Sequence, residues 1–155
     1  MRPLNRTFLA LATALILALG CDTPKEAGKK RSDQKEPESH SEKAPHGGPL
    51  FADEGDRHHA ELVIDRAAKK ATVYFYDSKV KEPVCIGDKT ISLNIAEKPP
   101  VQIELKADAQ KSDPAGTASR FSGEHDRLGA ELDLEKVEIE AKLNGKSHVF
   151  KLDKD

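Results

Sequence analysis

The sequence predicts an all-β protein, an antiparallel, immunoglobulin-like β-sandwich of about seven to eight strands, with a small β-barrel as the alternative. Short runs in which apolar and polar residues alternate are typical of strands with one buried face. The pair Asn144-Gly145, between two such runs, is typical of a tight hairpin turn. No long helical pattern accompanies these runs, and a two-layer sandwich is the usual way to pack so many antiparallel strands.

The first strands are expected after residue 60. Residues 61–65 and 71–76 are rich in Val, Ile, Tyr and Phe, and the polar residues between them predict a hairpin connection. A further short strand is expected over residues 80–85. Residues 91–95 alternate strictly, and because residues two apart in a strand point to the same side, they predict a strand with one buried face.

Two more strands and a long loop follow. Residues 101–105 alternate and predict a strand, and residues 118–121 predict a short one. The residues 107–118 between them contain the sequence Asp-Pro-Ala-Gly, which is turn chemistry, so we expect a loop there.

The end of the chain predicts a hairpin. Residues 129–136 are expected to form one helical turn at a sheet edge, and residues 137–143 to form a strand. Asn144-Gly145 suits a two-residue turn with positive φ at both positions, so we expect this strand to pair with the last alternating run of the chain.

The N-terminus has the layout of an export signal. Arg2 and Arg6 precede an apolar run from Phe8 to Leu19, which is short for a membrane span and is soon followed by Cys21. This end resembles a bacterial lipoprotein signal peptide, whose cysteine becomes the first residue of the mature chain and carries acyl chains. The alternatives are a plain secretory signal and an uncleaved anchor.

Composition and this resemblance divide the chain into three parts. Residues 1–20 are the expected signal peptide. Residues 21–44 are mostly charged or small, and they are expected to form a disordered tether because they cannot bury enough apolar surface to offset their conformational entropy. Residues 45–155 are the expected β-domain. We therefore expect an exported protein, attached to a cell-envelope membrane through lipid on Cys21, with its folded domain in the periplasm.

Charge and cysteine content exclude two classes of protein. Loss of Arg2 and Arg6 with the signal peptide lowers the formal net charge from −2 to −4, and no basic stripe is present, which excludes nucleic acid as a partner. Acylation of Cys21 leaves Cys85 as the only other cysteine, which excludes a disulfide scaffold. Cys85 lies in an apolar stretch and is expected to be buried; the alternative is an exposed thiol that binds Cu⁺.

Residues with metal-binding chemistry gather at the start of the expected β-domain. His59 and Glu61 point to the same face of a strand, and an imidazole beside a carboxylate can share one Zn²⁺ or Cu²⁺ ion. Two glycines follow His46 and let the chain bend, so that this imidazole can return over the strand. We predict a metal site of His46, His59 and Glu61, with His58 as a substitute if the register slips by one residue. The alternative is a hydrogen-bonded pair on a solvated face.

The remaining histidines are expected to have lesser roles. His125 lies in a polar loop and is expected to be solvated. His148 alternates with Phe150 and is expected to be a partly buried strand residue rather than a ligand. His40, in the tether, is expected to capture metal only loosely.

One motif carries a second resemblance. The order Pro45-His46-Gly47-Gly48, an apolar residue, Gly55 and then His59-x-Glu61-Leu62 resembles the small domain that precedes the adaptor core in heavy-metal efflux adaptors. It is also similar to a group of short bacterial lipoproteins. Because the helical-hairpin, lipoyl-like and barrel segments of an adaptor are not in this sequence, the resemblance implies metal capture or delivery and not the pump-adaptor role.

Together these features predict a function. No serine stands in a nucleophile-elbow context and no glycine-rich phosphate loop is present, so the protein is expected not to be an enzyme. The predicted function is that of a membrane-anchored exported lipoprotein whose β-domain binds a transition metal, for capture, delivery or sensing. The alternative is a non-catalytic structural or interaction module that binds another envelope protein.

Overall fold

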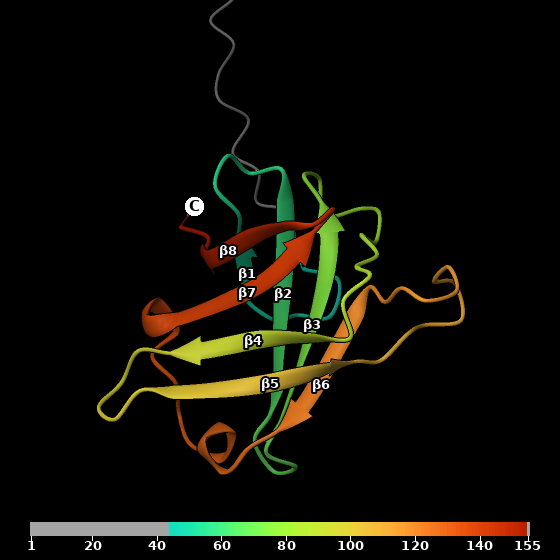
Figure 1. Cartoon of the computed structure of the whole chain (residues 1–155). Coiled ribbons are helices and arrows are strands. Elements are labelled where there is room, and N and C mark those ends of the chain that lie inside the picture. Colours follow the sequence, from blue (N-terminus) through green and yellow to red (C-terminus); the bar gives the residue numbers. More distant parts are fainter. Residues whose placement is uncertain (1–43, 155) are drawn as a thin grey trace, which may run out of the picture. The chain divides into compact units, whose positions relative to one another are not determined.

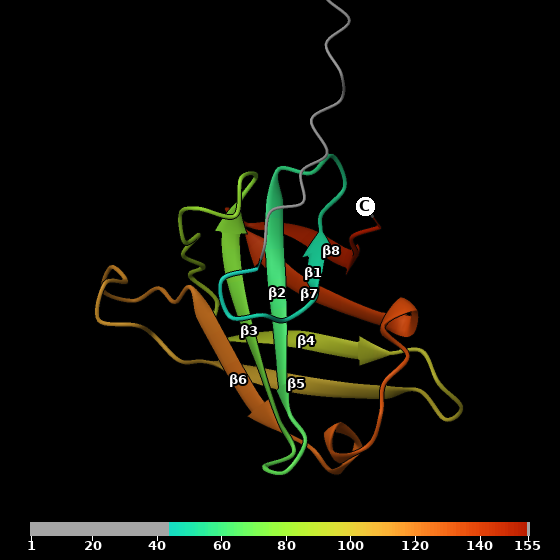
Figure 2. The same ribbon diagram turned by 180° about the vertical axis from the view of Figure 1, so that it is seen from behind.

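A computed structural model of the protein describes residues 44–154, and the expected signal peptide, Cys21, His40 and almost all of the expected tether lie outside them. Eight antiparallel strands close in the order β1-β2-β3-β6-β5-β4-β7-β8 into one barrel (Figures 1 and 2). The strands are β1 (Leu50–Ala52), β2 (His58–Asp65), β3 (Lys70–Asp77), β4 (Thr90–Ile95), β5 (Val101–Ala107), β6 (Arg120–Glu124), β7 (Val137–Leu143) and β8 (Lys146–Leu152). Two 3₁₀ helices, η1 (Asp126–Gly129) and η2 (Leu134–Lys136), lie between β6 and β7.

The all-β prediction is confirmed, in the form of its barrel alternative. In Figure 1, β4 and β5 run across the direction of β2 and β3, much as two packed layers would. The pairing of β1 with β8 and of β5 with β6 joins these layers, and each of these two seams contains only two residue pairs. Alternating hydrophobicity reports that a strand has one buried face, and this is equally true of a sandwich and a barrel.

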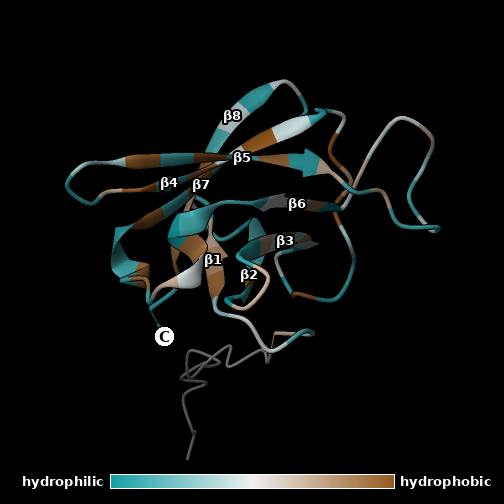
Figure 3. Ribbon diagram, turned by 90° about the horizontal axis from the view of Figure 1, so that it is seen from below, coloured by the Kyte–Doolittle hydropathy of each residue, from teal (hydrophilic) through white to brown (hydrophobic). Residues whose placement is uncertain are grey.

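The buried faces of the strands fill the barrel. Alternating apolar residues predicted from the sequence are buried in β4, β5 and β7, except Val101 at the start of β5, which is half-buried. The strands in Figure 3 carry alternating brown and teal segments accordingly. Phe75 lies at the centre of an aromatic cluster, with ring centroids 5.8 Å from Phe121 and 5.4 Å from Phe150 in edge-to-face contacts. Such contacts stabilise a core beyond the burial of their area.

The predicted final hairpin is confirmed in detail. Asn144 and Gly145 have φ values of 51° and 77°, and Leu143 pairs with Lys146 across the turn. The helical turn expected within residues 129–136 is η2, where the Asp133 carboxylate caps the N-terminus by accepting the backbone N–H of Glu135. Neither 3₁₀ helix of the described residues has the length and apolar character needed to cross a bilayer.

One expected strand is wrong and one strand was not expected. Residues 80–85 form a loop, held by the Asp77 carboxylate, which accepts backbone N–H groups from Lys79, Lys81 and Glu82. The strand β1 is only three residues long, too short for alternation to show in the sequence. It leads directly into the loop that carries Asp53.

Candidate metal site

The first described residues cross the outer face of the barrel. We call residues 44–49 the strap, which passes over β2 before the chain enters β1 (Figure 2). The backbone N–H of Leu62 donates to the carbonyl of Pro49. A Cβ at Gly48 would lie 2.3 Å from the carbonyl oxygen of Leu62, so this close approach requires glycine.

Glu61 fastens the strap to the barrel. Its side chain is fully buried, and its Oε1 accepts the backbone N–H groups of His46 at 2.8 Å and Gly48 at 2.9 Å. Its Oε2 lies 2.9 Å from His46 Nδ1 and 3.4 Å from the hydroxyl of Tyr76. Burial, followed by the charge of Glu61, raises the pKa of Tyr76, so the phenol keeps its proton and donates it. The His46 ring stacks on Tyr74 with centroids 3.8 Å apart.

The structure therefore joins two of the three predicted metal ligands. His46 returns over β2 to Glu61, as the two glycines suggested. His59 has other contacts: its Nδ1 lies 3.4 Å from the carbonyl oxygen of Asp77 and its Nε2 lies 3.8 Å from Oδ2 of Asp153. The ligand set of His46, His59 and Glu61 stays a prediction, and the contacts of Glu61 show a carboxylate already occupied by strap donors.

A second carboxylate lies among imidazoles inside one end of the barrel. His58 is two residues before Ala60 in β2, His148 is two residues before Phe150 in β8, and both of these neighbours are buried in the core. Asp53 likewise follows the buried Phe51 by two residues. Alternation within β2 and β8 points the two imidazoles inward, and Asp53, in the loop directly after β1, meets them there.

Asp53 bridges the two imidazoles. Its Oδ2 lies 2.9 Å from Nδ1 of His58 and 3.0 Å from Nδ1 of His148. Its Oδ1 accepts the backbone N–H groups of Arg57 at 2.8 Å and of His58 at 3.1 Å, which fixes the plane of the carboxylate. The two rings meet edge to face with centroids 5.6 Å apart.

The carboxylate is buried but the rings reach solvent. The side chain of Asp53 is fully buried, whereas those of His58 and His148 are 24% and 14% exposed. Burial raises the pKa of Asp53, but the hydrogen bonds from His58, Arg57 and His148 outweigh it and hold the pKa below its usual value. An ionised carboxylate only accepts hydrogen bonds, so each ring presents an Nδ1–H to it.

This arrangement could hold a metal ion. Within the described residues, these three form the group of His, Cys, Asp or Glu side chains whose ligand atoms all lie within 4.8 Å of one another. Two atoms bound about 2.05 Å from one ion are roughly 2.9 Å apart at a right angle and roughly 3.3 Å apart in a tetrahedron. The two distances to Asp53 Oδ2 fall at the lower end of this range. A metal would replace the two bridging hydrogens, and each neutral ring would then carry its hydrogen on Nε2.

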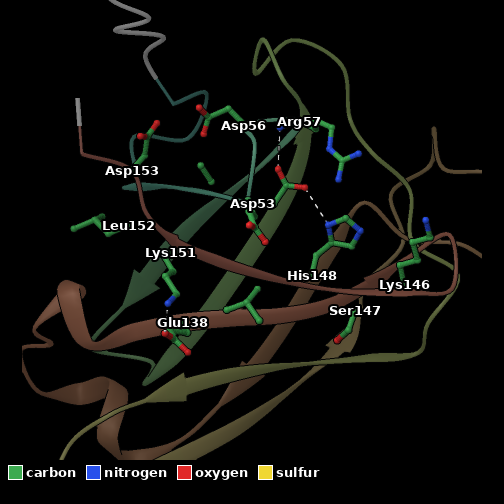
Figure 4. A pocket seen from close by; sticks show the side chains of 13 residues that line it. Asp53, Asp56, Arg57, Glu138, Lys146, Ser147, His148, Lys151, Leu152 and Asp153 are labelled. Carbon is green, nitrogen blue, oxygen red and sulfur yellow. Dashed lines mark hydrogen bonds and ion pairs between the residues drawn. The ribbon is translucent and has the colours of Figure 1, made fainter.

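An open pocket of about 840 Å³ adjoins the site (Figure 4). Asp53 and His148 line it, together with Arg57 from the loop before β2 and Lys151 and Leu152 from β8. Of the two imidazoles, His148 lines this pocket, so the pocket connects solvent to one of the partly exposed rings. Ligand sites of proteins commonly have volumes of about 300–1,000 Å³.

The sequence predicts part of this site. His58 was predicted only as a substitute ligand, and His148 as a strand residue; it is one, and it also contacts Asp53. Asp53 could not be predicted as a ligand from the sequence, because it lies in a short loop 95 positions before His148. Alternation within β8 could have placed His148 on the inner face, but nothing in the sequence pairs β8 with β1.

The other residues singled out in the sequence lie apart from both carboxylates. His125 is exposed, as expected, and caps η1 by accepting the N–H of Arg127. Cys85 is half-buried, and its thiol lies 3.6 Å from Asp113 Oδ1. Burial, then the charge of Asp113, raises the pKa of Cys85 and favours the thiol over the thiolate.

Comparison of the chain with protein-family models, with curated proteins and with solved structures gives no significant match.

Proposed function

We propose that this protein is an exported lipoprotein, anchored through acylated Cys21, whose barrel binds a divalent transition metal, Zn²⁺ or Cu²⁺, through Asp53, His58 and His148. The observation that carries the metal proposal is the buried carboxylate of Asp53 held between two partly exposed imidazoles. Imidazole suits both metals, and a carboxylate completes a set that Zn²⁺ commonly adopts. The proposed role is metal binding for capture, delivery or sensing rather than catalysis.

Contacts from outside the ligand set support this assignment. Metal-binding groups in proteins are held by such hydrogen bonds, and their loss typically weakens metal affinity about 10–100-fold. Two backbone N–H groups hold the free oxygen of Asp53 in this way. The carboxylate would thus stay oriented when a metal replaces the hydrogens on its other oxygen.

The anchor and the export route are supported by the sequence. The charged N-terminus, the apolar run and Cys21 are typical of a lipoprotein signal, and several acyl chains on one cysteine give firm membrane attachment. The similarity of the Pro45–Leu62 motif to that of short bacterial lipoproteins and efflux adaptors supports a metal-related role in the periplasm.

Calorimetric titration of Zn²⁺ and Cu²⁺ tests the metal proposal. The chain from Asp22 onward, which contains all described residues, is expected to bind one ion at micromolar affinity or tighter. A His58→Ala, His148→Ala double variant is expected to lose this binding. A His46→Ala, His59→Ala double variant is expected to bind the metal as the wild type does. Loss of metal binding in this second variant would place the site on the outer face of the barrel instead. If the wild-type protein binds neither metal, the metal proposal fails, and the alternative function of a non-catalytic module that binds another envelope protein remains.

Metabolic labelling with a fatty-acid analogue tests the anchor. In a bacterial host, the full chain is expected to incorporate the label and to sediment with membranes. A Cys21→Ser variant is expected to do neither, and a Cys85→Ser variant to do both. Label on Cys21→Ser would exclude the lipoprotein assignment.

A further inference from the structure

The pocket beside the metal site suggests a second ligand. Three protein ligands leave a transition ion with at least one coordination position to fill, as in zinc sites that keep an open position. The carboxylate of Asp53 is fully buried, whereas the imidazoles of His58 and His148 are partly exposed. An unfilled position on the side of His148 would open toward the pocket, because His148 lines it.

The charge at the proposed site favours an anion there. A divalent ion bound by one carboxylate and two neutral imidazoles keeps a net charge of about +1, and bound ions are often the largest local charges in a site. The charged side chains of the pocket are Asp53, Glu54, Asp56, Arg57, Glu138, Lys146, Lys151 and Asp153. The acidic excess attracts a metal cation and repels a free anion, so the metal must bind before the anion.

Arg57 is placed to recognise that anion. Its backbone N–H donates to Asp53 Oδ1 at 2.8 Å, which ties the residue to the site, while its side chain is exposed and lines the same pocket (Figure 4). Lys151 pairs with Glu138 at 3.2 Å, whereas among the described residues Arg57 takes part in no ion pair. A guanidinium that is not engaged elsewhere can bind a carboxylate through two parallel hydrogen bonds.

We infer that the metal-loaded protein binds a small anion of the carboxylate class, which ligates the metal at the open position and pairs with Arg57. This inference rests on the proposed metal site. The protein would then take up or release its metal as a complex with a small carboxylate.

Azide titration of the Cu²⁺-loaded protein tests the inference, because azide gives a charge-transfer band only when it ligates the metal. We expect a saturable band, suppressed by acetate as a competitor, and no azide binding by the metal-free protein. Arg57→Gln is expected to bind Cu²⁺ as the wild type does but to weaken azide binding about tenfold, because the charge-assisted hydrogen bond from the guanidinium is lost. Arg66→Gln, with the same charge change at the other end of β2, is the matched control and is expected to leave azide affinity unchanged.

The outcomes separate the two proposals. Cu²⁺ binding without an azide band would overturn the anion site and leave the metal site standing. An azide band with equal affinity in the wild type and Arg57→Gln would overturn the role of Arg57, and failure of acetate to compete would overturn the carboxylate class. Failure of Cu²⁺ to bind at all would overturn this inference, and failure of Zn²⁺ to bind as well would overturn the proposed function with it.

Discussion

The two buried carboxylates of the barrel have closely matched contacts but different partners. In each, one oxygen accepts two backbone N–H groups and the other oxygen faces ring donors. Glu61 has one imidazole and one phenol as ring donors, both on the outer face near its own strand. Asp53 has two imidazoles, from β2 and β8, at one end of the barrel.

The same arrangement of hydrogen bonds around a buried carboxylate can therefore serve two purposes. A phenol that keeps its proton is a donor and not a ligand, so Glu61, His46 and Tyr76 form a latch for the strap. Two imidazoles can exchange their shared hydrogens for a metal, so Asp53, His58 and His148 form a candidate site. The number of imidazoles, rather than the burial of the carboxylate, separates the two.

The largest expected effect is on the latch. Glu61→Ala leaves two strap N–H groups and the Tyr76 hydroxyl without their acceptor, and we expect it to lower the free energy of unfolding by about 3 kcal/mol. Urea unfolding measures this loss. Glu61→Gln keeps one acceptor oxygen and should lose roughly half as much. Zn²⁺ affinity should be unchanged in both variants, and a parallel loss of metal binding would contradict the separation of the two carboxylates.

Metal binding should appear as a gain in stability at the Asp53 site only. At a Zn²⁺ concentration about 100-fold above the dissociation constant, the wild type should gain about 2.7 kcal/mol, because only the folded state holds the site. Thermal melts with Zn²⁺ and with a chelator measure the gain. His148→Ala should lose it and His46→Ala should keep it; an equal gain in both variants would place the ion elsewhere.

The strap itself offers a smaller test. A Cβ at position 48 would lie 2.3 Å from the backbone oxygen of Leu62, so Gly48→Ala should displace the strap and destabilise the barrel by roughly 1–3 kcal/mol, as overpacking does. A Cβ at position 47 would have no atom within 4 Å, so Gly47→Ala tests strain from the positive φ of 79° alone. Denaturant midpoints rank the two variants, and Zn²⁺ affinity should stay at the wild-type value in both.

The smallest effect is expected in acid. The pKa of Asp53 is lower in the folded state than its usual value of 3.8, so protonation favours unfolding. Its contribution to stability is full above the unfolded-state pKa and is lost as pH falls through the lower folded-state pKa. Between pH 5 and about 2, metal-free wild-type protein should therefore lose stability more steeply than Asp53→Asn. Parallel slopes in urea unfolding would show that Asp53 does not contribute.

The all-β class, the alternating core of β4, β5 and β7, and the final hairpin follow from local periodicity and turn chemistry, so they could be predicted from the sequence. The sequence also predicted that His46 returns over β2, since two glycines permit the bend. Fifteen residues separate His46 from Glu61, within one supersecondary unit.

The closure of the barrel and the meeting of the site residues depend on long-range strand pairing and could not be predicted from the sequence. Closure depends on the two-pair seams of β1 with β8 and of β5 with β6, which no local pattern encodes. The first of these seams joins the start of the described domain to its end and brings His148 to Asp53 across 95 residues. A strand's alternation fixes which side chains point inward, but strand pairing alone decides which of them meet.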